Sequence, residues 1–384
     1  MIKIEDKSMC CGCTACYAIC PHDAIEMTAD PLGFKYPEVD MDRCVDCGLC
    51  EKVCVFSKAS QHRKEPVRCM AMRHNDKDEL LSSRSGAVFP ALAEVVLKHG
   101  GSIYGAAFTE DFMVAHKRGT DTRACRNFRG SKYVQSDMGN TFRMALRDLQ
   151  SGVPVLFSGT PCQTAALDSY VPDRFRDKLY LVDIVCHGVP SPSVWRDNLK
   201  YQCGRLGAPL TEVSFRDKRM FGWTSHVETY RSGPAVVSDD MFTTLFYENV
   251  MLRESCHVCP YASVKRSSDV TLADFWGWQK VLPDEFGSDD RGVSLVLANT
   301  DKGLKLIDTI EGSFTSAEVE LKDCLQPNLL QPTPCGKSRN RFVRTYTRKG
   351  FHKAAARYDK RNLRNRINLL YLEVRKKLRR TLGL

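Results

Sequence analysis

Two runs of cysteine near the N-terminus have the spacing needed to hold metal clusters. The pattern Cys-x2-Cys-x2-Cys-x3-Cys occurs at residues 10–20 and again at residues 44–54. Three thiolates on one tight loop can bind three irons of a cubane, and the fourth iron needs a ligand from outside that loop. The repeated spacing therefore predicts two clusters, each completed by the fourth cysteine of the other run.

This spacing is typical of bacterial two-cluster ferredoxins, in which the ligands are crossed in this way. We expect two [4Fe-4S] clusters, one held by Cys10, Cys13, Cys16 and Cys54, the other by Cys44, Cys47, Cys50 and Cys20. Gly12 and Gly48 let the backbone pass close to inorganic sulfur. Two zinc sites fit the spacing poorly, because zinc usually takes its ligands as two separated pairs. Cys11 is expected to be a spectator.

The composition places these cysteines in a reducing compartment. Eighteen cysteines among 384 residues would suit a secreted disulfide scaffold only with an export signal, and the first residues lack the apolar stretch of one. No run approaches the roughly 18 apolar residues of a spanning helix. Hydrophobic residues at 43% and charged residues at 27% exclude a disordered, collagen-like or coiled-coil chain. We therefore expect a cytoplasmic protein.

Positive charge is concentrated at the C-terminus. The formal net charge is +10, yet residues 336–384 alone hold 17 Lys and Arg against two Asp and Glu. Apolar residues at steps of three and four predict an amphipathic helix in this tail: Leu363, Ile367, Leu370, Val374 and Leu378. Such a helix suits peripheral contact with the inner membrane face, and equally a helix docked on the acidic remainder or a solvated tail. A basic tail alone does not indicate nucleic acid, and none is expected.

The middle of the chain alternates strand and helix patterns. Strands are expected near residues 67–72, 102–108, 153–157, 179–185, 270–273 and 293–298, and helices near 87–99, 141–150, 162–169 and 302–310. Alternation predicts an α/β body with a largely open sheet, whose ligands collect where strands end in loops. The expected fold class is α+β and α/β: a ferredoxin-like module, an α/β body and a basic helical tail. The expected domains are residues 1–56, 67–152, 153–335 and 336–384.

Four further cysteines fall at strand ends or in a tight pair. Cys162 and Cys186 each follow an expected strand, and Cys256 and Cys259 form a Cys-x2-Cys pair. These four suffice for a third cluster, and a helix start at Cys162 favours a thiolate. Spacing alone leaves open that the two single cysteines are buried free thiols and that the pair binds zinc or is redox-active.

Several segments, in order, resemble the coenzyme F-420 hydrogenase/dehydrogenase beta-subunit family. They are residues 129–139 (RGSKYVQSDMG), 157–167 (FSGTPCQTAAL), 183–192 (DIVCHGVPSP), 251–262 (MLRESCHVCPYA), 268–278 (SDVTLADFWGW) and 291–300. The resemblance extends to about residue 350 and includes the ferredoxin module that many bacterial members carry. The family includes flavoprotein subunits that pass electrons between iron–sulfur clusters, FAD and a deazaflavin, and a plant chlorophyll-cycle reductase.

The resemblance implies a cofactor set for the body. The family's body cluster maps onto the four body cysteines, so a third [4Fe-4S] cluster is expected. Ser85 and Gly86 match a Ser-Gly-Gly segment ahead of the family's first helix, with Ala87 in place of the second glycine. Backbone N–H groups at that helix start would hold the pyrophosphate of FAD. The alternative is a plain N-cap by Ser83 or Ser85.

The same resemblance places other residues near the flavin. Lys132 and Tyr133 match a lysine–tyrosine pair whose lysine would stabilise reduced anionic flavin, unless it is simply solvated. His187 is the candidate catalytic residue, as a proton donor to substrate; its alternatives are a hydrogen bond to cluster sulfur and structural packing. Loops beside or after expected ligands carry three more candidates for flavin contact, Thr160, Asp274 and Trp276.

The leading hypothesis is an iron–sulfur flavoenzyme. Electrons would pass between the ferredoxin clusters, the body cluster and FAD, which would reduce or oxidise a small organic substrate or coenzyme F-420. Clusters carry one electron each, whereas a flavin handles one or two. The expected partner is an electron donor or acceptor protein, either a hydrogenase/dehydrogenase subunit or a ferredoxin. The alternative is a non-catalytic electron-transfer subunit, and a zinc-stabilised interaction protein is the third hypothesis.

Overall fold

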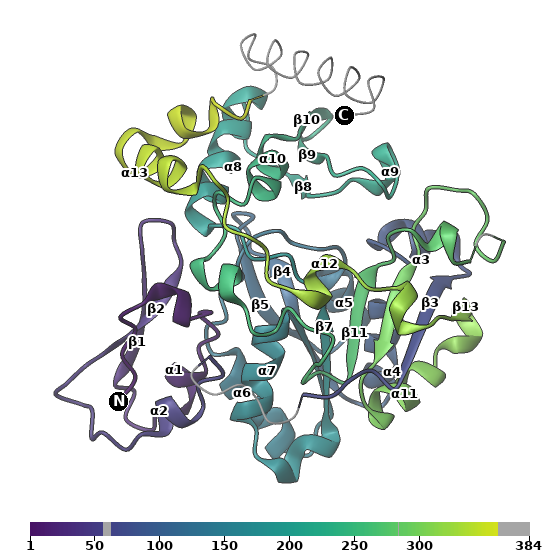
Figure 1. Ribbon diagram of the computed structural model, residues 1–384, viewed down its shortest axis with the longest axis horizontal. Coiled ribbons are helices and arrows are strands. Elements are labelled where there is room, and N and C mark those ends of the chain that lie inside the picture. The colour runs from purple at the N-terminus through teal and green to yellow at the C-terminus, as the bar shows by residue number, and fades with distance from the viewer. Residues whose placement is uncertain (57–62, 283, 360–384) are drawn as a thin grey trace, which may run out of the picture.

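The computed structural model describes residues 1–56, 63–282 and 284–359. The tail helix expected from Leu363 onward, and the membrane contact expected of it, lie outside these residues. Within the described ranges, no helix is long and apolar enough to cross a bilayer. Figure 1 shows an N-terminal module beside a body built on a large sheet, with a smaller unit above the body.

The N-terminal module consists of two short helices and a two-stranded antiparallel sheet. Helices α1 (Ala15–Ile19) and α2 (Leu49–Lys52) each begin within a cysteine run, and β1 (Ile25–Ala29) pairs with β2 (Lys35–Val39). The second residue after the first cysteine has a positive φ in both runs, 69° at Gly12 and 47° at Asp46, and so does the fourth, 68° at Thr14 and 74° at Gly48. The two cysteine loops therefore share one backbone conformation.

An eight-stranded mixed sheet forms the body, in the order β13-β3-β12-β11-β7-β6-β4-β5. The strands are β3 (Arg68–His74), β4 (Ser102–Phe108), β5 (Val114–Gly119), β6 (Val155–Gly159), β7 (Leu179–Ile184), β11 (Val270–Asp274), β12 (Ser294–Ala298) and β13 (Phe314–Glu318). The central strands β11, β7, β6 and β4 are parallel. The mixed α/β fold expected from the sequence is confirmed. Strands from both sides of residue 152 share this sheet, so residues 67–335 form one continuous body.

Helices cover both faces of the sheet. On one face lie α4 (Val88–Lys98), α5 (Thr122–Phe128) and α11 (Asp301–Asp308), and on the other α6 (Thr141–Gln150) and α7 (Pro161–Tyr170). Successive strand side chains point to opposite faces. Leu156 accordingly packs beneath α4, while its neighbours Val155 and Phe157 pack beneath α6 and α7. The helices leave uncovered the edge of the sheet at which the parallel strands have their carboxyl ends.

Residues 192–247, within the segment between β7 and β11, form the smaller unit above the sheet edge (Figure 1). It contains α8 (Pro192–Leu206), β8 (Glu212–Ser214), α9 (Lys218–Phe221), β9 (Glu228–Ser232), β10 (Ala235–Asp239) and α10 (Met241–Tyr247). The Trp195 ring packs 4.4 Å from that of Phe215 and 4.9 Å from that of Phe242, measured between centroids. The same core includes Phe342 and Phe351 of α13 (Arg339–Ala355). The first part of the basic tail is therefore docked on this unit.

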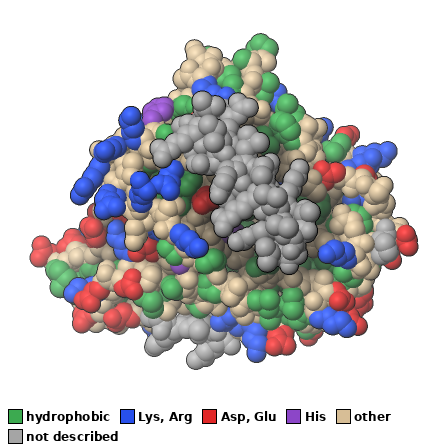
Figure 2. Space-filling view, turned by 45° about the horizontal axis from the view of Figure 1, so that its top comes forward, with side chains coloured by type: hydrophobic (Ala, Val, Ile, Leu, Met, Phe, Trp, Pro, Cys, Tyr) green, Lys and Arg blue, Asp and Glu red, His purple; other side chains and the backbone are tan. Residues whose placement is uncertain are grey.

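Charge is distributed unevenly between these parts. Residues 1–56 hold ten Asp and Glu against five Lys and Arg, whereas α13 is rich in basic residues. In Figure 2 acidic side chains gather over the N-terminal module, at the left, and basic side chains above it. The module is therefore the acidic end of the described chain.

Candidate functional site

Each cysteine set expected to bind a ferredoxin cluster lines its own hollow. The first hollow contains Cys10, Cys13, Cys16 and Cys54, and the second contains Cys20, Cys44, Cys47 and Cys50. The backbone N–H groups of Ile2 and Ala24 lie 3.3 and 3.4 Å from the sulfurs of Cys50 and Cys20. Hydrogen bonds to sulfur are among the features that set the potential of a bound cluster. The fold thus brings together the crossed ligand sets that the spacing predicts.

The four body cysteines line a third hollow where β6 and β7 end. Cys162 is in the first turn of α7, and Cys186 follows β7. Cys256 lies in the short helix η3 (Glu254–Val258), and Cys259 is the residue directly after this helix. Hydrogen bonds from Cys11 and Thr160 lower the pKa of Cys162 to about 7 in spite of burial, whereas burial raises the pKa of Cys256 to about 11. Coordination to a metal removes such thiol protons outright.

The arrangement of the donors distinguishes clusters from single ions. In the described part of the chain, no three Cys, His, Asp or Glu side chains converge closely enough to hold one metal ion. Zinc draws four ligands to about 2.3 Å from one centre, whereas the thiolates of a cubane stand apart at its corners. The three rings of cysteine around hollows therefore fit [4Fe-4S] clusters better than zinc.

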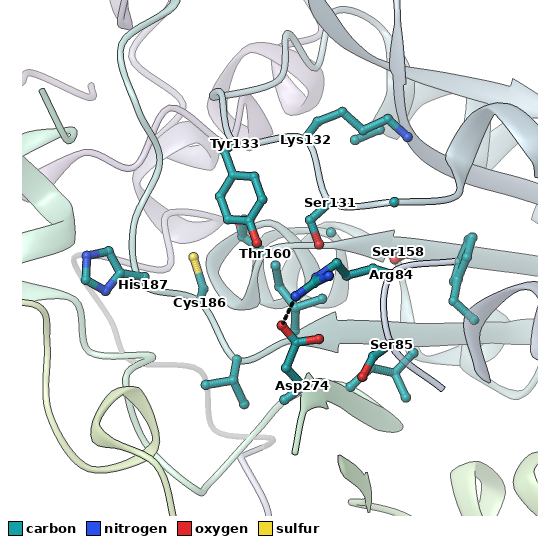
Figure 3. Close-up of a pocket in the computed structure, with 18 of the residues that line it drawn as sticks. Arg84, Ser85, Ser131, Lys132, Tyr133, Ser158, Thr160, Cys186, His187 and Asp274 are labelled. Carbon is teal, nitrogen blue, oxygen red and sulfur yellow. Dashed lines mark ion pairs between the residues drawn. The ribbon is translucent and has the colours of Figure 1, made fainter. Parts of the chain in front are cut away.

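A cavity of about 450 Å³ opens at the same edge of the sheet (Figure 3). Its walls come from the loops after β6, β7 and β11, the start of α4, and the unit above the sheet. It shares Thr160, Cys186 and His187 with the hollow of the body cysteines. Seven of the residues expected near flavin or substrate line it: Ser85, Lys132, Tyr133, Thr160, His187, Asp274 and Trp276.

Gly86 is placed differently from the other expected residues. It does not line the cavity, and its N–H donates to Ser294 Oγ at 2.8 Å. A Cβ at this position would lie 2.0 Å from the carbonyl oxygen of Met72 on β3. Close packing against the sheet therefore accounts for this glycine.

The start of α4 faces the cavity without a side-chain cap. Ala87 occupies the N-cap position with φ 66°, and within the described residues no side chain caps the N–H groups of Val88 and Phe89 in the first turn. Ser85 Oγ donates instead to the carbonyl of Val293 at 2.6 Å. The alternative of a plain serine cap is thus not what the structure contains. An uncapped helix start is a favourable place for an anion.

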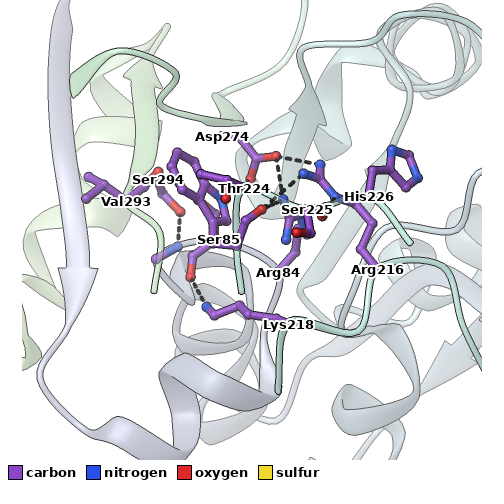
Figure 4. A network of polar contacts seen from close by, with 12 residues as sticks. Arg84, Ser85, Arg216, Lys218, Thr224, Ser225, His226, Asp274, Val293 and Ser294 are labelled. Carbon is purple, nitrogen blue, oxygen red and sulfur yellow. Dashed lines mark hydrogen bonds and ion pairs between the residues drawn. The ribbon is translucent and has the colours of Figure 1, made fainter. Parts of the chain in front are cut away.

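A cluster of cations that sequence reasoning missed surrounds Asp274 (Figure 4). Asp274 Oδ2 lies 3.1 Å from Arg216 Nη1 and 3.4 Å from Arg84 Nη2. Lys218 Nζ donates to the carbonyls of Leu80 and Ser85, and burial lowers its pKa to about 7. Among the residues lining the cavity four are basic and only Asp274 is acidic. The excess of positive charge suits an anionic ligand.

Arg84 still has capacity to bind such a ligand. Its side chain is 11% exposed, and its buried Nε and Nη1 have no hydrogen-bond partner within the described ranges. Buried polar groups are normally paired, so an unpaired guanidinium edge at a cavity indicates a missing acceptor. The only sequence signal for Arg84 is its place directly before Ser85, in a segment already assigned to the cofactor.

Aromatic rings and hydrogen bonds fix the remaining cavity residues. Trp276, 44% exposed, stacks on Trp223 with centroids 4.5 Å apart. Tyr133 points its hydroxyl into the cavity in Figure 3 and accepts from Arg216 Nη1 at 3.3 Å. His187 Nε2 lies 2.7 Å from Asn249 Oδ1, which orients the ring beside Cys186.

Lys132 is held by the backbone. Its Nζ donates to the carbonyls of Asn127 and Arg129, both at 2.8 Å. Burial lowers its pKa to about 7. This lysine is therefore a fixed part of the cavity wall and not a solvated side chain.

Comparison with known families bears on both halves of the chain. Residues 9–58 match a 4Fe-4S dicluster domain, and residues 153–322 match the C-terminal domain of the coenzyme F420 hydrogenase/dehydrogenase beta subunit. The fold and its thiolate rings thus define an iron–sulfur electron-transfer protein. More particularly, a segment similar to a ferredoxin-type dicluster domain precedes one similar to the C-terminal domain of this beta-subunit family, which confirms the resemblance found in the sequence.

Individual relatives match over short stretches. A 65-residue stretch is 36% identical to an iron-sulfur subunit of the CoB–CoM heterodisulfide reductase of Methanocaldococcus jannaschii, over 14% of this chain and 10% of that protein. A 51-residue stretch is 37% identical to an uncharacterized ferredoxin of the same organism, over 13% of this chain and 65% of that protein. The chain therefore spans less than two thirds of either relative. A xenon-derivatized F420-reducing [NiFe] hydrogenase complex from Methanosarcina barkeri gives a TM-score of 0.46 at 18% identity, over 77% of this chain and 91% of that chain.

Proposed function

We propose that this protein is a cytoplasmic FAD- and iron–sulfur-dependent oxidoreductase. Electrons pass between the ferredoxin clusters, a third [4Fe-4S] cluster in the body and FAD, and the substrate is a small organic molecule or the deazaflavin coenzyme F420. The observation that carries the proposal is the shared wall between the body-cysteine hollow and the cavity, formed by Thr160, Cys186 and His187. A ligand in the cavity would lie against a cluster ligand.

The cavity offers complementary groups for each part of FAD. The uncapped start of α4 and the free edge of Arg84 suit a pyrophosphate. Tyr133 and Trp276 present aromatic surface, and Lys132, in its protonated form, would supply positive charge that stabilises an anionic ring. When bound, FAD would supply the exchange between one-electron and two-electron steps. The size of the cavity falls in the usual range for cofactor sites, about 300–1,000 Å³.

His187 is the residue we propose as proton donor to the substrate. It lies on the cavity wall next to Cys186, and its hydrogen bond to Asn249 fixes the ring. A His187→Gln substitution should lower the turnover of substrate while leaving iron and flavin contents unchanged. Unchanged turnover would contradict the proposed proton transfer and would show that His187 serves only in packing.

A non-catalytic electron-transfer subunit is the second candidate. Cys47 is exposed at the outer hollow of the acidic module, where Met41 and Val45 are 64% and 61% exposed. This end of the module is therefore accessible to an electron donor or acceptor protein. In this second case a separate chain would carry the chemistry, and the purified protein would reduce no small acceptor unless that chain were added.

Anaerobic purification with iron, sulfide and flavin quantified together tests the proposal. We expect about twelve irons for three cubanes, with one FAD per chain. The Cys162→Ser protein should lose about four of those irons and keep the ferredoxin clusters, whereas a Cys203→Ser control should lose none. Protein that contains iron but neither retains nor rebinds FAD would contradict the enzyme proposal.

A further inference from the structure

Arg253 is a buried arginine at the junction between the ferredoxin module and the body. It lies in the body, three residues before Cys256, and none of its surface is exposed. Its guanidinium donates to the carbonyls of Cys10 and Lys35 at 2.7 and 2.9 Å, and to Gln135 Oε1 at 3.0 Å. These acceptors are neutral, so none of them cancels its positive charge.

The same guanidinium reaches a cluster ligand of the module. Its Nη2 lies 3.6 Å from Cys10 Sγ. A Cβ on Gly12 would lie 2.8 Å from Nη1, so glycine at this position lets the first cysteine loop close onto the arginine. Arg253 also lines the hollow of the body cysteines. One buried positive charge therefore adjoins both sets of thiolates.

Cys11 occupies the wall between the same two hollows. It lines both of them and is only 8% exposed. Its thiol lies beside Cys13 and Cys162, one proposed ligand from each set, and their proximity raises its pKa. Its carbonyl accepts from Gln135 Nε2 at 2.9 Å, so one glutamine ties Cys11 to Arg253. The sequence predicts a spectator at Cys11 because it adjoins a ligand, and the spacing does not reveal its proximity to Cys162, 151 positions away.

We infer that Arg253 and Cys11 form the electron-transfer junction between the body cluster and the ferredoxin cluster of Cys10, Cys13, Cys16 and Cys54. The inference rests on the proposed function, because it requires both clusters. One electron leaves the reduced cluster and enters the oxidised one, with no bond or proton transferred. Arg253 is a positioning residue that fixes the first cysteine loop on the body. Its charge raises the potential of that cluster, because a positive charge favours the more negative, reduced form.

Redox titration of the full-length holoprotein, followed by EPR, tests the role of Arg253. Cys16→Ser and Cys47→Ser proteins first assign the signals of the two ferredoxin clusters. We call the cluster of Cys10, Cys13, Cys16 and Cys54 the near cluster and the other ferredoxin cluster the Cys47 cluster. Arg253→Met should lower the equilibrium constant for reduction of the near cluster about tenfold, which lowers its reduction potential by about 59 mV for one electron. The reduction potential of the Cys47 cluster should not change. Arg253→Lys, which keeps the charge, should shift it less.

Arg143 provides a matched control for this titration. It also fastens the module to the body, by donating to the carbonyls of Tyr17 and Ala18 at 3.0 and 3.1 Å. It is already paired with Asp23 at 2.7 Å, and its hydrogen bonds to described residues go to carbonyl and carboxylate oxygens, not to a sulfur. Arg143→Met should therefore leave the near-cluster potential unchanged. Full iron content with an unshifted potential in Arg253→Met would overturn the inference.

Cys11→Ala tests the junction even if the Arg253 variants fail to assemble. We expect its iron content to equal that of the parent protein, because Cys11 is not a ligand. A second variant tests the distance between the two clusters. Cys162→Ser lacks the body cluster, so in its reduced form the EPR signal of the near cluster should become narrower, while that of the Cys47 cluster should not change. Loss of about four irons in Cys11→Ala, or a near-cluster signal indifferent to the body cluster, would overturn the inference. Absence of iron or FAD from the parent protein would instead refute the proposed function.

Discussion

Asp274 Oδ2 and Arg216 Nη1 lie 3.1 Å apart in a cavity wall where both side chains are nearly buried, at 12% and 5% exposure. The second oxygen of Asp274 accepts from Trp223 Nε1 at 3.0 Å, and Gln326 donates to its backbone carbonyl. Both carboxylate oxygens of Asp274 therefore have partners, and Oδ2 holds Arg216 and Arg84 in place. It sets the charge of the cavity and the orientation of the groups that face a ligand.

Replacing Asp274 with asparagine should destabilise the body strongly. Removing one partner of a buried ion pair leaves an uncompensated charge and typically costs about 3–5 kcal/mol. Denaturant unfolding of the flavin-free protein would measure the loss. Glu320→Gln is the control, because Glu320 pairs with Lys322 at an exposed site and its replacement should cost far less than that of Asp274. Equal losses in the two variants would contradict the assigned role of Asp274.

Lys132 should give the protein a characteristic pH dependence. Its pKa is about 7 when folded, far below that of an exposed lysine, because the site is buried. Between pH 7 and about 10 the unfolded chain binds a proton that the folded chain has lost, so stability rises with pH by at most about 1.4 kcal/mol per unit. Lys132→Met should remove this contribution, and Lys322→Met should not. Parallel stability curves for Lys132→Met and the parent would contradict the prediction.

Ala87→Gly should stabilise the protein. Ala87 has φ 66°, a left-handed conformation that is strained for any residue with a Cβ. Relief of that strain, less the entropy that glycine loses on folding, should gain about 0.5–1 kcal/mol. The matched control is Ala91→Gly in the middle of the same helix, which should cost about 1 kcal/mol. Thermal unfolding of both variants would show whether their effects have opposite signs.

Gly12→Ala and Gly48→Ala should differ, although each glycine lies in a cysteine run with a positive φ. Both glycines have positive φ, but a Cβ meets nothing within 4 Å at Gly48 and meets Arg253 at 2.8 Å at Gly12. Gly48→Ala should therefore cost only the backbone strain, about 1–2 kcal/mol, whereas Gly12→Ala should also loosen the module from the body. Hydrogen exchange across the junction would report the difference, and equal protection in the two variants would contradict it.

The fold was predictable where a strong pattern ran through each element. The strand expected at residues 102–108 and the helix at 141–150 have the bounds that the structure gives them. The unit between β7 and β11 was missed, because β8 to β10 are short and rich in polar residues, as in the sequence of β9 (ETYRS). Weak alternation of this kind is hard to distinguish from loops.

The candidate site was predictable only where residue type and spacing were both unusual. Crossed thiolate sets follow from the two cysteine runs, and the structure brings them together. Arg216 and Lys218 come from an ordinary-looking charged loop, and their approach to Asp274 depends on a fold that spacing does not encode. Arg253 lay inside a recognised motif, and an arginine just before a cysteine pair was the signal that passed unnoticed.

The unit above the sheet has a consequence for how this architecture can diversify. This unit, residues 192–247, contributes Arg216, Phe246 and Tyr247 to the cavity and none of the twelve proposed cluster ligands, although Cys186, Cys256 and Cys259 flank it in the chain. Substitutions in this unit can change which molecules enter the cavity without changing the residues that hold the clusters. Under the proposed function, exchanging this unit between homologous chains would change the substrate and leave the cluster ligands in place.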